Sequence, residues 1–403
     1  MSLLLWLALH AQVLEQRGFV EIRGIGFAQK APNDNGSVVG ESLLRYEATW
    51  RPKPWLKLQA GFDARFDTHR QFDRELRLDV ADRRVQRPAL SLRRLSLQAH
   101  RSHWTAEVGR QFVRWGKTDL LTPTDRFAPK DFLNVAYSDF LAIPAARVTY
   151  EKGNDTIDIV MQARFVPSRG PLLKQRWVAL PRELDGIALR DQGAQYPGGV
   201  QTGVRWNHVG RGYEYALMFY EGRNHLPLFA GSLASLDPVT IGVQRYFPHL
   251  RQYGGDVALP LQWFTLKAEA AYYQSNTLGA DEFVLYVVQL ERTIGEWTLV
   301  GGYAGEAVTN STGNRLLFSP DRGLAKAFLG RVSYTIDAHR SVASDFAVRQ
   351  NGKGVLTRFE YSQTFGQHWR TTAQVSVIRG DASDFLGQYR RNSSAALIVR
   401  YSF

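Results

Sequence analysis

The sequence has no cysteine in its 403 residues, and it has no long hydrophobic run. Without cysteine the chain can form no disulfide framework, no thiolate metal site and no cysteine nucleophile. No stretch approaches the roughly 20 apolar residues that a membrane-spanning helix needs. These absences exclude a disulfide-stabilised domain, a cysteine-dependent enzyme and a helical membrane protein.

Aromatic and charged residues are plentiful. The chain holds 22 Phe, 17 Tyr and 10 Trp, which is too many for a chain that never packs, so disorder is excluded. Lys plus Arg is 50 and Asp plus Glu is 38, giving a formal net charge of +12. A basic excess fits nucleic acid, lipid phosphates or small anions, and composition alone does not choose among them.

The N-terminal residues 1–18 are expected to be a short or truncated leader that precedes one domain, residues 19–403. Leu3 to Leu9 is a short apolar stretch, and Leu9-His10-Ala11 resembles the end of a secretory signal. The stretch is short, however, and no Lys or Arg precedes it. An incorrectly chosen start codon explains the same residues.

From Phe19 onward the dominant period of the sequence is two. The stretch from Leu56 to Phe66 alternates apolar and polar residues, and similar alternation returns along the chain. Successive side chains of a strand point to opposite faces, so each such segment has one apolar and one polar face. Eighteen segments follow this pattern, at 19–28, 41–51, 54–66, 88–100, 103–113, 144–152, 155–166, 198–208, 212–223, 251–259, 262–273, 281–292, 296–305, 326–336, 341–350, 354–364, 368–379 and 392–403.

Short connections between these segments alternate with connections that are mostly long. An even number of ten-residue strands, with short turns at one end and long loops at the other, is typical of a bacterial outer-membrane barrel. The predicted fold is therefore all-β, a transmembrane antiparallel up-and-down barrel of about 18 strands. A sandwich has no reason to sort its turns by length, and a propeller would show a fixed repeat.

Three stretches depart from simple alternation. Across Arg93-Arg94 the apolar parity switches, which predicts a β-bulge. Segment 281–292 is apolar on both faces, so its inward face is expected to pack under a loop. The strand-like stretch from Thr240 to Phe247 would spoil the turn alternation, and we assign it to a structured outer loop.

The last segment ends at Phe403, two residues after Tyr401. It resembles the C-terminal strand by which the assembly machinery of Gram-negative outer membranes recognises its clients, so we assign Tyr401 and Phe403 to an assembly signal. An ordinary edge strand is the alternative. Aromatic residues near the ends of several segments, including Trp104, Trp297 and Trp369, are expected on the outer face as membrane-interface girdles.

The long connection from Arg114 to Ile143 is the third long loop and is rich in turn and charge signals. Gly109-Arg110-Gln111, Trp115-Gly116, Asp119, Pro123-x-Asp125 and Pro129-x-Asp131 resemble porin-like and alginate-export-like outer-membrane proteins. The resemblance implies passive passage of small solutes or of a polymer, and a loop after the fifth strand that folds into the barrel. The local match covers about twenty residues, and the architectural match covers nearly the whole chain.

Charged residues of this loop are the candidate constriction. A transverse field from facing cations and anions orders permeating dipoles and ions. Alternatively Asp125 caps a short helix after Pro123 and Asp131 closes a turn after Pro129. A divalent cation bound by Asp119, Asp125 and Asp131 is a third reading. The predicted constriction residues are Arg114, Lys117, Asp119, Asp125, Arg126, Lys130 and Asp131.

Strand parity places many charged residues on the lumen face, with arginine prominent. The acidic and basic sets are close in size, which fits either a braced, mixed-charge wall or a mild preference for anions. Arginine suits both bracing and carboxylate binding. The predicted pore-lining residues are Arg45, Arg65, Arg147, Arg164, Arg205, Arg331, Arg358, Arg370 and Arg400.

The sequence lacks the parts of common enzymes: it has no G-x-S-x-G, no H-E-x-x-H and no phosphate loop. We therefore expect no catalytic residues, cofactor or metal. The alternative is a barrel hydrolase with Ser, His and Asp on separate strands. The predicted function is an outer-membrane porin-like channel for small hydrophilic solutes. The alternatives are a barrel that scaffolds a partner complex and an export conduit for an anionic polymer.

The predicted partners are outer-membrane lipids and lipopolysaccharide, the barrel-assembly machinery and the permeating solutes. Nucleic acid is not expected, because the basic residues form no single patch. The sequence leaves the oligomeric state open. Both chain ends are expected on the periplasmic side.

Overall fold

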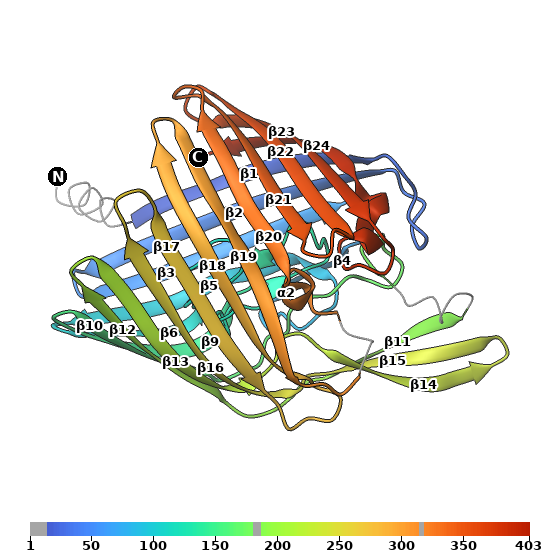
Figure 1. The fold of residues 1–403 in the computed structure, drawn as a ribbon, viewed down its shortest axis with the longest axis horizontal. Coiled ribbons are helices and arrows are strands. Elements are labelled where there is room, and N and C mark those ends of the chain that lie inside the picture. Colours follow the sequence, from blue (N-terminus) through green and yellow to red (C-terminus); the bar gives the residue numbers. More distant parts are fainter. Residues whose placement is uncertain (1–13, 180–186, 314–317) are drawn as a thin grey trace, which may run out of the picture.

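The structure, a computed structural model, describes residues 14–179, 187–313 and 318–403. Within these ranges eighteen antiparallel strands pair in chain order, and β1 pairs with both β2 and β24, which closes the sheet into a barrel (Figure 1). The barrel strands are β1 (Leu14–Phe27), β2 (Val38–Lys53), β3 (Leu56–Asp67), β5 (Arg87–Arg101), β6 (Trp104–Gln111), β9 (Ile143–Lys152), β10 (Asp155–Gln162), β12 (Gln201–Gly210), β13 (Tyr213–Arg223), β16 (His249–Pro260), β17 (Thr265–Gln274), β18 (Glu282–Ile294), β19 (Trp297–Asn310), β20 (Ala327–Thr335), β21 (Arg340–Arg349), β22 (Gly354–Phe365), β23 (Trp369–Gly380) and β24 (Ser394–Ser402).

The remaining elements lie in the long loops. A further strand, β4 (Phe72–Asp79), runs parallel to β5. β7 (Lys130–Asp131) and β8 (Asp139–Phe140) form a small hairpin. β11 (Ala188–Gln195), β14 (Leu228–Leu236) and β15 (Val239–Tyr246) form a separate sheet that extends beyond the barrel at its loop end (Figure 1). The short helices are α2 (Pro320–Gly323) and the 3₁₀ helix η2 (Gly387–Asn392).

The predicted barrel is confirmed, because each of the eighteen alternating segments overlaps one barrel strand. The stretch from Thr240 to Phe247 is outside the barrel sheet, as expected, and all of it but Phe247 belongs to β15. The predicted leader, residues 1–18, falls largely outside the described residues, and Leu14 to Gly18 belong to β1. No helix of the described chain has the length and apolar character of a transmembrane helix.

The predicted β-bulge in β5 is also present. Gly61 of β3 pairs with Arg94, and the next residue, Phe62, pairs with Leu92, so Arg93 has no partner opposite it. The extra residue lets two consecutive arginines point inward: Arg93 lies 3.3 Å from Asp139 and Arg94 lies 3.0 Å from Glu107. The bulge therefore places two arginines of β5, instead of one, at the same level of the lumen.

The outer face is apolar, and it carries aromatic rings near the short-turn end. Trp104, Trp297 and Trp369 are each about half exposed. Their rings lie 4.6–5.0 Å from the rings of Tyr150, Tyr334 and Tyr401 on adjacent strands. Paired amphipathic rings at one level of a barrel are the arrangement that a membrane interface favours.

Candidate functional site

Residues 112–142, here the constriction loop, fold into the barrel between β6 and β9. The contact that fixes this loop is the carboxylate of Glu269, on the inward face of β17 and only 2% exposed. Glu269 accepts hydrogen bonds from the backbone N–H groups of Lys117 and Thr124, at 2.9 and 2.7 Å. It also accepts bonds from the backbone and hydroxyl of Thr118 and from the hydroxyl of Thr124. One buried carboxylate thus satisfies five donors of the loop.

Apolar packing covers the same part of the loop. Phe127 is 1% exposed, and its ring lies 5.1 Å from both Trp115 and Tyr220 in edge-to-face geometry. Leu121 belongs to the same core cluster as Leu285 of β18. The expectation that segment 281–292 packs under a loop is confirmed. We call residues 113–127 the anchored half of the loop, because buried apolar contacts and Glu269 hold them against β13, β17 and β18.

The rest of the loop, residues 128–142, crosses to the opposite strands and is here the crossing half. The Tyr137 hydroxyl donates to Gln374 of β23 at 2.6 Å. The guanidinium carbon of Arg358, on β22, lies 4.5 Å from the centre of the Tyr137 ring. Beyond Tyr137 the chain exposes Ser138 and then brings Asp139 to the arginines of β2, β3 and β5. The loop therefore spans the lumen instead of lining one side.

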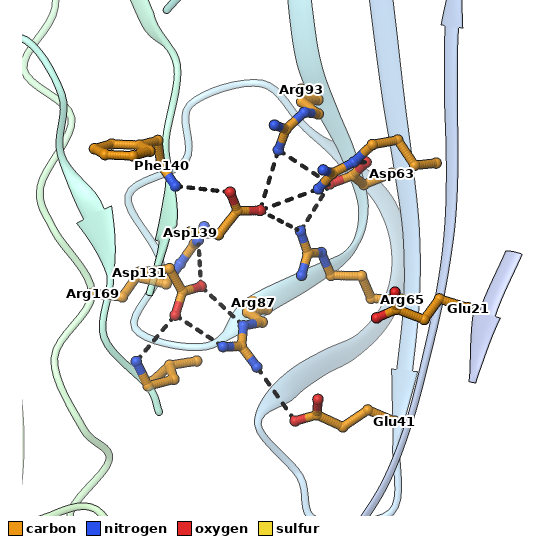
Figure 2. Close-up of polar contacts among 12 residues, drawn as sticks. Glu21, Glu41, Asp63, Arg65, Arg87, Arg93, Asp131, Asp139, Phe140 and Arg169 are labelled. Carbon is orange, nitrogen blue, oxygen red and sulfur yellow. Dashed lines mark hydrogen bonds and ion pairs between the residues drawn. The ribbon is translucent and has the colours of Figure 1, made fainter. Parts of the chain in front are cut away.

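Figure 2 shows Asp139 pointing from the loop toward three arginines on the strands. Its carboxylate lies 3.2 Å from Arg45, 3.7 Å from Arg65 and 3.3 Å from Arg93. Asp63, which is 2% exposed, also pairs with Arg45 and Arg65 at 2.8 Å. These three arginines are here the arginine cluster. Arg93 also lies 3.7 Å from Glu47, which pairs with Arg17, so four arginines meet three carboxylates at the site.

Asp139 is ionised more readily than an ordinary aspartate. Burial alone would raise the pKa of its carboxyl, but Arg93, Arg45 and Arg65 outweigh that effect and hold the pKa below its usual 3.8. The side chain is still 45% exposed. Asp139 therefore attaches the end of the loop to the arginine cluster while remaining in contact with water.

The predicted constriction residues separate into exposed and buried groups. Asp119 is 57% exposed and lies 2.9 Å from Lys267. Burial would raise its pKa, but hydrogen bonds from Lys267 and Gln289 prevail and lower it. Lys117 pairs with Glu214 of β13. Arg114 is 47% exposed, and its guanidinium lies 4.1 Å from the ring of Phe140. These three residues are in reach of water in the lumen.

The other four predicted residues are mostly buried and structural. Asp125 accepts the backbone N–H groups of Trp115 and Gly116 at 2.6 and 2.7 Å. It caps no helix, because the chain after Pro123 forms a turn, so the predicted short helix is wrong. Asp131 receives two hydrogen bonds from Arg87, at 2.9 and 3.1 Å, and one from Arg169. Arg126 and Lys130 line a small cavity beside the loop.

The proposed divalent-cation site is wrong. Asp119, Asp125 and Asp131 lie with different cationic partners, which are Lys267, Arg114 and Arg87 respectively. In the described parts of the chain no three His, Asp or Glu side chains gather as metal ligands. Each aspartate is already neutralised by a neighbouring side chain, which leaves no shared site for a cation.

Strand register places eight of the nine predicted pore-lining arginines on the inward face, and most of the eight have a carboxylate partner. The ninth, Arg164, lies beyond the end of β10, so strand register does not place it. Among the eight inward arginines, Arg370 has no ion pair within the described residues. The ion pairs are Arg45–Asp63, Arg65–Asp63, Arg147–Asp158, Arg205–Asp256, Arg331–Asp345, Arg358–Asp345 and Arg400–Glu21.

The residues assigned to an assembly signal lie where β24 meets β1. Phe403 is 50% exposed, and its backbone exchanges two hydrogen bonds with Gly18 at 2.9 and 3.0 Å. The ring of Tyr401 lies 5.0 Å from Trp369. Both aromatic residues have a structural role at the seam that closes the barrel.

The sequence reading missed a second inserted segment, residues 163–179, here the mouth segment. The backbone N–H of Phe132, in the constriction loop, donates a hydrogen bond to the carbonyl oxygen of Arg169 in this segment at 2.9 Å. Arg176 lies 3.5 Å from the ring of Phe27 and donates to the Gly36 carbonyl at 2.9 Å. Trp177 is 2% exposed in a core cluster with β1 and η2. The mouth segment therefore runs from the end of β10 to the loop end of β1.

Known structures share this architecture at very low sequence identity. A BenF-like porin from Pseudomonas fluorescens Pf-5 is 10% identical, with a TM-score of 0.56 and coverage of 97% of this chain and 98% of that one. The outer membrane protein OpdK from Pseudomonas aeruginosa is 9% identical, with a TM-score of 0.54 and coverage of 96% and 99%. No protein-family model matches the chain, and no curated protein matches it. The similarity establishes the fold: a closed 18-stranded barrel like that of these porins.

Proposed function

We propose that the protein is a passive channel of the bacterial outer membrane for small hydrophilic solutes. The observation that carries this proposal is the constriction loop, which buried contacts fix inside a closed barrel. A barrel of this size encloses an aqueous lumen unless it is filled, and a fixed inner loop narrows the lumen without moving parts. The fold shared with two porins supports the same function.

We also propose a mild preference for anions. The arginine cluster and Arg17 place four cations against Asp63, Asp139 and Glu47, and Arg370 on β23 adds a cation that has no ion pair among the described residues. Positive side chains around a narrow lumen favour anions. The preference is mild, because the other inward arginines are braced by carboxylates on neighbouring strands.

In this proposal the short-turn end, where β1 begins and β24 ends, faces the periplasm, and the loop end faces outward. The apolar outer face with its aromatic rings would contact lipid, and basic residues of the outer loops would pair with lipopolysaccharide phosphates. Tyr401 and Phe403 would serve the assembly machinery before they close the barrel. Oligomers are common among barrels of this kind.

The test is single-channel recording of the refolded protein in a planar bilayer under a KCl gradient. We expect stable conductance steps and a reversal potential whose sign indicates that chloride permeates more readily than potassium. The fold is checked first, by β-sheet circular dichroism and by heat-dependent gel migration. A folded barrel that gives no conductance would contradict the channel.

A second candidate function, a closed barrel that anchors a partner complex, is favoured by the mouth segment and by the sheet of β11, β14 and β15. The mouth segment crosses the loop end, and the sheet extends beyond the barrel (Figure 1). The absence of conductance would place this candidate first. An export conduit for an anionic polymer would need a continuous basic track, and carboxylates interrupt the row of inward arginines.

A further inference from the structure

Arg126 is a buried cation without a counter-ion at hydrogen-bond distance. The residue is 8% exposed, and none of the hydrogen bonds or ion pairs within the described residues involves its guanidinium. Its Nε atom is buried and has no partner. The nearest compensation is the ring of Tyr273, whose centre lies 5.0 Å from the guanidinium carbon. Buried charges in proteins are normally paired, so an isolated guanidinium indicates a missing partner.

The guanidinium borders a small cavity whose walls come from four separate segments. The cavity lies between the constriction loop, the mouth segment, the chain after β13 and α2. The space open to the centre of a water-sized group is about 20 Å³, which is room for one water or one small ion. A single occupant would therefore touch all four segments.

Besides Arg126, three side chains of the cavity wall have hydrogen-bond donors to offer. Lys130, whose side chain is 17% exposed, contributes its ammonium group. The Ser168 oxygen accepts the Lys130 N–H, which leaves its hydroxyl hydrogen free to donate. The Asn224 oxygen accepts the Leu226 N–H, which leaves its amide nitrogen free to donate. Together with Arg126 these groups suit an anion.

The two carboxylates of the wall, Asp321 and Asp125, act on Arg126 only through space: they favour its charged form, but neither forms a hydrogen bond or ion pair with its guanidinium among the described contacts. Asp125 is engaged by Arg114 and by two backbone N–H groups. Asp321 lies 3.8 Å from Lys130, and it forms no ion pair with Arg126 among the described contacts. Burial and the nearby Arg126 lower the pKa of His225 to about 4, against two backbone hydrogen bonds that raise it. Its ring nitrogens face the carbonyl oxygens of Val166 and Arg126, both at 2.6 Å.

We propose that this cavity binds one small monovalent anion of halide size, held by Arg126 and Lys130 with Ser168 and Asn224. The bound anion joins the anchored half of the constriction loop to the mouth segment and to the chain after β13. The loop is then held more firmly in halide salts than in salts of a large anion. This site is separate from the arginine cluster, and it does not depend on whether the barrel conducts.

The first experiment locates the ion. Crystals of the full-length protein are grown or soaked in bromide, and anomalous scattering is measured at the bromine edge. A peak between Arg126 and Lys130 is expected in the wild type and in Arg331→Gln, which removes an inward arginine far along the barrel. The peak should be lost in Arg126→Gln. A wild-type cavity that holds ordered water in bromide would overturn the proposal.

The second experiment measures the effect on the loop in solution. Limited proteolysis of the refolded barrel is followed in chloride, bromide and gluconate at equal ionic strength. A halide at ten times its dissociation constant should slow opening-limited cleavage of the constriction loop about tenfold. Arg126→Gln should cleave at one rate in all three salts. If this variant does not fold, Lys130→Gln should show a weaker halide effect than the wild type. Equal cleavage of the wild type in all three salts would contradict the site even if the channel conducts.

Discussion

The two halves of the constriction loop are held in place by opposite kinds of contact. The anchored half is fixed by dry contacts, although Arg114 and Asp119 on it reach water: Phe127 and Leu285 are each 1% exposed, and Glu269 satisfies the loop backbone from within this core. The crossing half is buried at residues 131–134, but its far end is fixed by a wet, charged contact, with Asp139 45% exposed among Arg45, Arg65 and Arg93. Buried contacts determine where the loop lies, whereas in the proposed channel the water-exposed ion pairs would determine which ions meet it.

This difference follows from the residues of the strands. β13, β17 and β18 turn apolar side chains such as Met218, Ala271 and Val287 inward, although inward positions of a wide barrel normally meet water. β2, β3 and β5 turn arginines inward. The loop covers the first surface and only touches the second, so the passage is expected to run along the arginine side.

The largest effect is expected from Glu269→Ala, which removes the acceptor for five hydrogen bonds of the anchored half. Leaving the buried N–H groups of Lys117, Thr118 and Thr124 unsatisfied should cost about 4 kcal/mol of the free energy of unfolding. Single-channel recordings should show larger and noisier currents, because the loop is released. Glu107→Ala, which breaks an inward ion pair with Arg94 away from the loop, is the control. Quiet currents of normal size in Glu269→Ala would show that the loop needs no anchor.

Leu285→Ala tests the apolar part of the same surface. The side chain is 1% exposed, so its truncation leaves a cavity beneath the loop and should cost about 2–4 kcal/mol. Urea unfolding in detergent, followed by tryptophan fluorescence, measures the loss. Leu290→Ala on the same strand, 45% exposed on the outer face, should cost less than about 1 kcal/mol. Equal losses for the two variants would mean that the loop does not pack on β18.

A smaller effect is expected at the crossing half when the pH is lowered. The Asp139 pKa is lower in the folded protein than its usual 3.8, so its ion pairs contribute fully above that value and are lost as the pH falls through the lowered value. Because the side chain is nearly half exposed, the contribution should be about 1 kcal/mol or less. Current fluctuations should therefore rise only below about pH 4. In Asp139→Asn they should be raised already at neutral pH, and a variant that stays quiet would contradict the role of Asp139.

The smallest effect is expected from Arg93→Gln, which removes the arginine that the β-bulge adds to the lumen. The loop stays anchored, so the conductance should change little, while the reversal potential moves a few millivolts away from the anion side. Asp139→Asn should move it in the opposite direction, because it removes a negative charge from the same cluster. Shifts of equal sign in the two variants would show that neither residue faces the permeating ions.

The fold was largely predictable, because strand periodicity depends on local alternation. The eighteen segments, the bulge at Arg93 and the outer position of β15 all follow from patterns within a few residues. Helix capping at Asp125 was a wrong prediction. Its carboxylate bonds back to Trp115 and Gly116, ten and nine positions earlier, and no short pattern distinguishes this contact from a cap.

The residues that hold the loop were not predictable from the sequence. Glu269 lies in an ordinary alternating strand, and its partners are about 150 residues away in the chain. Asp139 lacks the local signal of Asp125 and Asp131, each of which follows a proline by two residues. The mouth segment carries one signal that could have been noticed: Trp177 is a large aromatic residue in a loop otherwise rich in polar residues and proline. Long-range contacts of this kind are set by barrel closure and not by local sequence.

The most direct test of the central claim uses the absence of cysteine, which makes every introduced thiol unique. Ser138→Cys places a thiol at the exposed end of the crossing half, and Ala271→Cys places one beneath the anchored half, where the alanine is 2% exposed. Each variant is recorded in a planar bilayer while a charged, membrane-impermeant thiol reagent is added. The account predicts a stepwise fall in conductance for Ser138→Cys and none for Ala271→Cys. A fall for Ala271→Cys, with Ser138→Cys unaffected, would contradict it.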